Sequence, residues 1–318
     1  SNLYRYGFII EATSNIKEEW LYQKKLKKYA QEVALFTRLN REFNLGASFS
    51  EAKDIESKTR ENALFLPVVA QFNGLISQEI LAWFDKLTII SNLRSEEFKH
   101  FSFEMLEDEE FREKIVKFIK SADTGITDIK KKKIDFASLN IESDELKELP
   151  DFLLEKLKEE GLSTVETMHM QYDNNNMFKQ LKSFSLNFES DGTQKLLALS
   201  APLIDALLNG EIIVVDELDN SLHTDLVQAI VKLFNCPKSN PNNAQLIFST
   251  HDTNLLNQEL FRRDQIWFVQ KDIYGSSELY SLIEYGEGKI REDLALEKNY
   301  LNGKFGGKPY ISSSLMEL

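Results

Sequence analysis

Cysteine is almost absent from this sequence. A single cysteine, Cys236, occurs among 318 residues, which excludes an internal disulfide framework and fits the reducing cytosol. Long apolar runs are absent too, because segments such as Leu64–Ala70 and Ile212–Val215 are far shorter than the roughly 18 residues that a membrane span needs. No charged and apolar leader opens the chain. These absences predict a cytoplasmic protein with no membrane partner.

Positive charge is also scarce. The chain has 38 basic and 51 acidic residues and a net charge of −13, which disfavours broad, non-specific nucleic-acid binding because lysine and arginine supply most of the affinity for phosphate. The best candidate for a local basic patch is Lys130–Lys133. A solvated loop or an edge strand is the simpler interpretation of such a short run.

The first residues, SNLYRYGFII, contain no initiator methionine, and we expect the chain to be a fragment of a longer protein. Aromatic and β-branched residues in Tyr4–Ile10 and Lys17–Tyr22 predict two strands joined by a turn, and therefore an antiparallel pair.

Helical periodicity dominates from about residue 35 to residue 162. Phe111, Ile115 and Phe118 recur at helical spacing, and Ser95 suits a helix start. The segment LPDFLLEKLKEEG predicts a further helix that stops at Gly161. We therefore expect a helical insertion, either a coiled-coil arm or a compact cap, and Pro67 and the short helices favour the cap.

Strands and helices alternate in the remainder of the chain, residues 163–318. Apolar strands such as EIIVVDEL and AQLIFSTHD are separated by helical segments such as GTQKLLALSAPLIDALL and SLHTDLVQAIVKLF. This alternation is typical of a parallel sheet covered by helices. The predicted fold is α/β, with a parallel sheet flanked by helices, a helical insertion and an N-terminal antiparallel strand pair.

Two acids, Asp216 and Glu217, follow the apolar strand EIIVV. Ligands of open α/β sheets bind outside the carboxyl ends of the strands, and an acid at this position can hold Mg²⁺ in a phosphoryl-transfer site. Because side chains alternate along a strand, Glu217 could face an attacking water while Asp216 faces the metal. A strand that simply ends in a polar turn remains the alternative.

Two further features complete the candidate chemistry. His251 follows the strand AQLIF and could donate a hydrogen bond to a γ-phosphate, and Ser190 with Gly192 begins a helix whose N-terminus could hold phosphate. The simpler interpretations are a structural histidine and an ordinary N-cap. That interpretation is retained for the other three histidines, His100, His169 and His223.

The order of these elements resembles the second lobe of ABC-type ATPases in the SMC-like branch. There SDGTQ stands for the signature motif, IIVVDE for Walker B, LDNSLH for the D-loop and STHD for the switch histidine. More narrowly, the chain through RRDQIWFVQKD and NYLNGKFGGKPY is similar to bacterial AAA-type ATP-binding proteins of the AbiLii/abortive-infection group, which belong to phage-defence systems.

This resemblance implies an ATPase that uses ATP and Mg²⁺ and forms a homodimer on ATP binding. It implies a nuclease partner, often of the TOPRIM type, or nucleic acid, and three segments: residues 1–34 as a remnant of the first ATPase lobe, 35–162 as the insertion and 163–318 as the second lobe. The resemblance also implies individual roles at one nucleotide site: Asp216 positions the metal, Glu217 is the general base and His251 contacts the γ-phosphate. Ser190, Gly192 and Gln194 belong to the signature that contacts the opposite subunit's nucleotide. Asp219 lies at the dimer seam.

The Walker A pattern of the family, Gly-x₄-Gly-Lys-Ser/Thr, does not occur in the sequence. Gly303–Lys308 has the wrong spacing, and Pro309 replaces the hydroxyl residue. We therefore expect this chain alone to bind ATP weakly or not at all and to be inactive, and the full-length protein to bind it. Gln71 is interpreted as a packing or surface residue, not as a Q-loop glutamine.

Two other functions are compatible with parts of the pattern. A non-catalytic interaction module would keep the fold without the chemistry. A helicase would explain the acids in DELD, but it should have a serine-alanine-threonine motif after them and a second RecA-like lobe, and STHD suits the first interpretation better.

Overall fold

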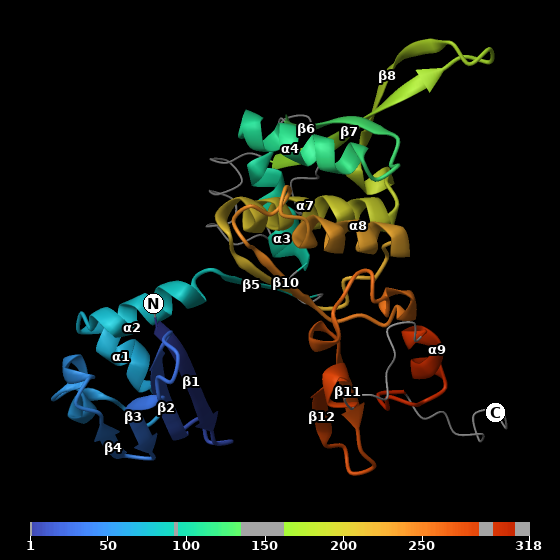
Figure 1. The fold of residues 1–318 in the computed structure, drawn as a ribbon. Coiled ribbons are helices and arrows are strands. Elements are labelled where there is room, and N and C mark those ends of the chain that lie inside the picture. The colour runs from blue at the N-terminus through green and yellow to red at the C-terminus, as the bar shows by residue number, and fades with distance from the viewer. Residues whose placement is uncertain (1, 92–94, 135–161, 286–294, 309–318) are drawn as a thin grey trace. The chain divides into compact units, whose positions relative to one another are not determined.

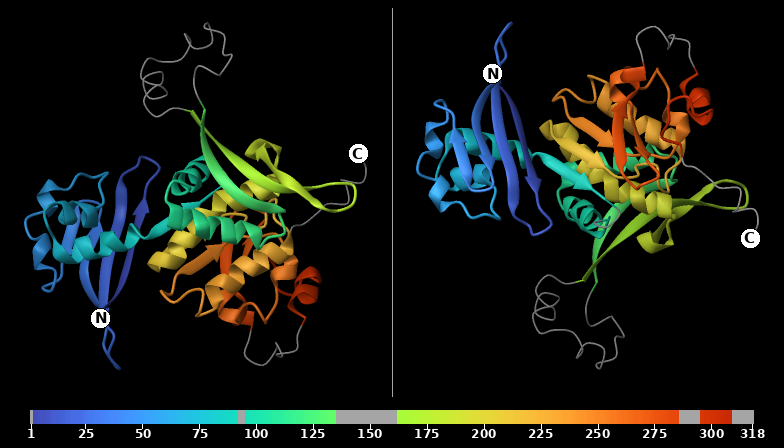
Figure 2. Two further views of the ribbon diagram at one scale, coloured as in Figure 1. Left: turned by 90° about the horizontal axis from the view of Figure 1, so that it is seen from above. Right: turned by 90° about the horizontal axis from the view of Figure 1, so that it is seen from below.

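The computed structural model describes residues 2–91, 95–134, 162–285 and 295–308. Its chain divides into two compact units, Ser1–Leu87 and Thr88–Leu318 (Figures 1 and 2). The limits expected after residues 34 and 162 do not coincide with this division and stay predictions about functional segments.

The first unit is an antiparallel sheet packed against two helices. Strands β1 (Asn2–Ile10), β2 (Ile16–Lys25), β3 (Val33–Leu39) and β4 (Glu42–Leu45) are hydrogen-bonded in chain order. Helices α1 (Phe65–Gln71) and α2 (Leu75–Phe84) share one apolar core with the sheet. The two predicted strands are confirmed as β1 and β2, and the predicted pair is part of a larger sheet.

A buried carboxylate joins the sheet to α1. Glu19 of β2 is fully buried, and its oxygens accept hydrogen bonds from Phe65 N at 2.7 Å, Leu66 N at 3.0 Å and Tyr6 Oη at 2.9 Å. The guanidinium of Arg38 lies 3.5 Å from the same carboxylate. Because no side chain of α1 itself caps its first turn, Glu19 supplies the acceptors that the first backbone N–H groups need.

The second unit contains the predicted parallel sheet. Strands β10 (Gln245–Phe248), β9 (Ile212–Val215) and β5 (Leu87–Ile90) lie in that order, and β9 and β10 are parallel with Val215 opposite Phe248. Buried residues of α7 (Asp191–Asn209) and α8 (Thr224–Asn235) share one core with β9, and Figure 1 shows both helices beside the sheet. The predicted α/β fold is confirmed.

An antiparallel sheet of three strands packs on the same core. It is formed by β6 (Ile126–Ile134), β7 (Leu162–Tyr172) and β8 (Phe178–Ser185), in that order. Helices α3 (Ser95–Met105) and α4 (Glu109–Lys120) pack against α7, and α4 also packs against β6. A hairpin of β11 (Trp267–Lys271) and β12 (Ser277–Ser281), together with α9 (Leu296–Leu301), surrounds a smaller apolar cluster.

The segment expected to be a helical insertion, residues 35–162, contains both helices and strands. Its described part contains α1 to α4, but also most of β3 and all of β4, β5 and β6. Apolar runs as short as VALF and LTII do not reveal whether a helix or a strand buries them, and pairing with distant strands decides the outcome. The helix expected to end at Gly161 lies outside the described residues.

Candidate functional site

The two acids after β9 stand at the start of a sharp turn. Asp216 is exposed and Glu217 is half-buried. The backbone of Glu217 has a φ of 50°, a left-handed conformation that is uncommon for a residue with a Cβ. The chain therefore leaves the sheet at Glu217, and the side chains of both acids are at the carboxyl end of β9, where the sequence predicts them.

Ser249 connects this turn to the end of β10. Its hydroxyl donates to Asp216 Oδ1 at 2.6 Å and accepts from Glu217 N at 2.8 Å, and its carbonyl accepts from Leu218 N at 3.1 Å. Ser249 was not among the residues predicted from the sequence. A signal was available, because in-register parallel strands place the residue after Phe248 beside the residue after Val215.

His251 and Glu217 meet at the same rim of the sheet. Nε2 of His251 lies 3.6 Å from Glu217 Oε1, and the two side chains are 85% and 39% exposed. The backbone N–H of His251 faces the Asp219 carboxylate at 3.3 and 3.4 Å. An acid and an imidazole from two strand ends are thus brought together in a position that solvent, and hence a ligand, can reach.

The N-terminus of α7 packs beside this turn in the same chain. Ser190 is exposed and is the N-cap, accepting a hydrogen bond from Thr193 N at 3.2 Å. A Cβ on Gly192 would lie 2.6 Å from the carbonyl oxygen of Ser221, so only glycine allows this approach. The Gln194 side chain donates to Glu189 O at 3.0 Å and thereby stabilises its own helix start.

Lys195 joins α7 to the turn that carries the acids. Its ammonium donates to the carbonyl of Glu217 at 2.9 Å. Burial lowers the pKa of Lys195, and the nearby carboxylates of Asp219 and Glu217 oppose this shift only in part. Lys195 was not predicted from the sequence, since a lysine one turn into a helix is normally solvated.

A family model described as "AAA domain, putative AbiEii toxin, Type IV TA system" matches residues 1–257. The chain belongs to this family. The expected AAA-type ATPase domain is thus shown, and the family links it to toxin–antitoxin systems; its description names AbiEii where the resemblance suggested AbiLii. No curated protein matches the chain.

The other histidines of the AAA domain have structural partners. His223 is the N-cap of α8 and accepts from Asp225 N at 3.2 Å, and His100 lies 3.3 Å from Glu104, one helical turn away. His169 of β7 lies 2.7 Å from Glu189 Oε1. Since Glu189 precedes Ser190, this contact ties the antiparallel sheet to the start of α7.

The side chains at the rim can supply only some of the ligands that a hard cation needs. Among the described residues, no three His, Cys, Asp or Glu side chains gather around one point. The exposed carboxylate of Asp216 is the kind of oxygen ligand that Mg²⁺ takes once or twice alongside water and phosphate oxygens. Asp216 therefore fits the metal of a nucleotide complex but does not by itself form a metal centre.

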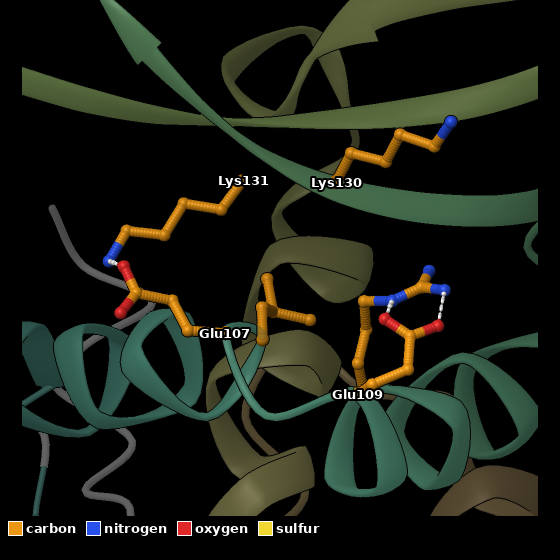
Figure 3. A pocket seen from close by; sticks show the side chains of 6 residues that line it. Glu107, Glu109, Lys130 and Lys131 are labelled. Atoms are coloured by element: carbon orange, nitrogen blue, oxygen red, sulfur yellow. Dashed lines mark hydrogen bonds and ion pairs between the residues drawn. The ribbon is translucent and has the colours of Figure 1, made fainter.

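A surface hollow of about 500 Å³ elsewhere in the AAA domain contains none of these rim residues. It lies between β6 and the α3–α4 junction, and Figure 3 shows Lys131 reaching Glu107 across it, at 2.6 Å. Lys132 in turn pairs with Glu166 at 3.0 Å. The basic run is thus an edge strand whose charges are partly matched by acids.

In the described part of the AAA domain, no helix is long and apolar enough to cross a membrane.

Proposed function

We propose that this AAA domain is the nucleotide-hydrolysing part of an ABC-type ATPase of the SMC-like branch. The observation that carries the proposal is the contact between His251 Nε2 and Glu217 Oε1, 3.6 Å long, at the rim where Asp216 also lies. An acid pair and an imidazole converging at the carboxyl ends of parallel strands suit phosphoryl transfer to water.

Each side chain at the rim has its own proposed role, set by its position. Bound Mg²⁺-ATP would supply the phosphoryl group, with Asp216 on the metal side. Glu217, whose backbone is held by Ser249 and Lys195, would accept the proton of the attacking water. His251 would donate to a phosphate oxygen. The Asp219 carboxylate accepts from the backbone N–H of His251 and so helps to fix the position of this residue.

The start of α7 supports assembly as a dimer. Ser190 is exposed, and the helix has backbone N–H groups at its tip that suit a phosphate. We propose that Ser190, Gly192 and Gln194 contribute to a nucleotide bound by a sister chain, and that Asp219 lies at the seam. Helix tip and D-loop would then respond together, since Gly192 packs on Ser221.

The family's link to toxin–antitoxin systems supports a role in defence. We propose that nucleotide-driven dimerisation in the cytoplasm controls a nuclease partner or nucleic acid in phage defence. The net charge of −13 favours a protein partner over a broad DNA surface on this chain.

The test is ATP titration by calorimetry, with turnover and size-exclusion measured in parallel. We propose that the chain is part of a longer protein that supplies the Walker A segment, and we expect weak or no binding by the 318-residue chain and clear binding by the product of its complete reading frame. In that product, Glu217→Gln should abolish turnover and accumulate ATP-bound dimers. Unchanged assembly and turnover would instead favour the non-catalytic interaction module, and tight ATP binding by the chain alone would contradict the expected need for a Walker A segment.

A further inference from the structure

The β7–β8 hairpin exposes an apolar face that the proposed ATPase site does not use. Met170 pairs with Leu181 and Tyr172 with Phe178 across the two strands, and Tyr172 Oη donates to Met170 Sδ at 3.2 Å. These four residues, here called the hairpin face, are 48% to 58% exposed. Figures 1 and 2 show the hairpin extending beyond α4. Four large apolar side chains gathered on one solvent-facing surface mark an interaction site.

A hollow of about 630 Å³ joins this face to α4. Met170 and Leu181 line it from the sheet, and Val116, Lys117 and Lys120 line it from α4. Arg112, which also lines it, is paired with Glu109 and Asp128 at 2.6 Å each. The hollow therefore has an apolar floor beside a helix edge that carries two exposed ammonium groups, those of Lys117 and Lys120, and one exposed carboxylate, that of Glu113.

The hairpin itself is close to neutral. Strand β8, FKQLKSFS, has two lysines and no acid, but Glu166 of β7 and Asp173 of the turn balance them. Lys182 follows Leu181 in the strand and pairs with His169, so its side chain points away from the hairpin face. A partner for this surface therefore needs apolar side chains for the hairpin face and carboxylates for Lys117 and Lys120 of α4.

We propose that the hairpin face and the adjoining hollow bind an amphipathic helix of another protein, with acidic residues flanking its apolar stripe. The two apolar pairs lie two residues apart along β7, or about 6.6 Å at 3.3 Å per residue. Apolar residues at i and i+4 of a helix rise about 6 Å along its axis. A helix lying along the hairpin would therefore place one anchor on each pair, and carboxylates on one flank would face Lys117 and Lys120.

Two other occupants fit less well. A second copy of this surface would bring its own Lys117 and Lys120 toward those of the first, and like charges oppose such pairing. A nucleic acid would match the lysines but would leave the exposed apolar pairs of the hairpin face without apolar partners. An acidic, amphipathic polypeptide satisfies the charge and the apolar surface together.

The experiment is selection of a displayed library of helical peptides, randomised at the apolar and flanking positions, on the 318-residue chain. We expect enrichment of large apolar residues at i and i+4 and of Asp or Glu on one flank. The double variant Met170→Ser/Leu181→Ser should weaken the selected peptides about tenfold or more. Lys117→Glu/Lys120→Glu should shift the selected flank from acidic to basic.

The matched control is Ile273→Ser, because Ile273 is 90% exposed but lies in the β11–β12 turn; it should bind as the wild type does. The substituted side chains of both double variants line the open hollow, and circular dichroism confirms that the variants fold. No enrichment, a basic or random flank on the wild type, or equal loss with Ile273→Ser would overturn the proposal. Binding of duplex DNA lost in Lys117→Glu/Lys120→Glu, or a dimer lost in Met170→Ser/Leu181→Ser, without peptide selection would assign the face to those occupants instead.

Discussion

Replacing Lys195 with methionine separates the stability of the fold from the geometry of the turn that carries Glu217. The substitution keeps most of the apolar stem and removes the ammonium that donates to Glu217 O at 2.9 Å. A hydrogen bond to a charged group contributes about 1.5–3 kcal/mol. Against this loss stands the desolvation of the ammonium, which is the main reason that the pKa of Lys195 is lowered.

The sign of that shift sets the expected pH dependence. A lysine whose pKa is lower in the folded state binds its proton less tightly there, so its charge costs stability at pH values below the folded pKa. The cost disappears as pH rises from the folded pKa toward the unfolded value of about 10.4. Lys195→Met removes this cost together with the hydrogen bond, and we expect the free energy of unfolding to change by no more than about 1 kcal/mol.

Function should respond much more strongly than stability. Without the ammonium, the turn loses a contact that holds the Glu217 backbone, and a small displacement of a catalytic carboxylate lowers turnover by about tenfold to a hundredfold. Urea denaturation of the 318-residue chain followed by circular dichroism measures the first effect, and steady-state hydrolysis by the complete protein measures the second. Lys232→Met, at an exposed lysine of α8, is the control. A loss of more than about 3 kcal/mol, or unchanged turnover, would refute this reasoning.

Three further substitutions test individual contacts. Ser249→Ala removes the bonds to Asp216 and Glu217; because the site is exposed, urea denaturation should show a loss of only about 1–2 kcal/mol, whereas no loss would mean that water replaces the hydroxyl fully. Gly192→Ala places a Cβ against Ser221 O and should cost about 1–3 kcal/mol in the same assay; a neutral result would show that the D-loop can move away. Glu19→Ala leaves Arg38 buried without its carboxylate and should lower the free energy of unfolding of the first unit by about 3–5 kcal/mol. Unfolding is measured by the fluorescence of Trp20. A smaller loss would indicate that the backbone carbonyls around Arg38 are sufficient partners for its guanidinium.

The elements nearest the site were predictable because their local signals are strong. The apolar runs IIVV of β9 and LIF of β10 are bounded by polar residues, and Ser190 caps α7 as its sequence suggests. Strand β6 was predicted only as one of two alternatives, a solvated loop or an edge strand, because the run of lysines in ITDIKKKKI hides the apolar positions that pack inward. Its residues pair with residues of β7 that lie between 28 (Ile134 and Leu162) and 43 (Ile126 and His169) positions further along the chain, which no local pattern reveals.

The residues of the candidate site also divide into those that could be predicted from the sequence and those that could not. Chain order alone suggested Asp216, Glu217, His251 and Ser190, since each follows or precedes a recognisable element. Ser249 and Lys195 were missed because their contacts depend on strand register and on how α7 lies against the turn. These are properties of tertiary packing, and the same holds for the close approach of Gly192 to Ser221.

Glu217→Gln in the complete protein is the decisive measurement, with ATP turnover and oligomeric state recorded on the same sample. The amide keeps the shape of the side chain but cannot accept a proton from water. We predict turnover reduced by about 10²- to 10⁴-fold and a dimer that persists in ATP and dissociates when ATP is removed. Turnover equal to that of the wild type, or a dimer indifferent to ATP, would contradict the proposed role of the acid pair at this sheet edge.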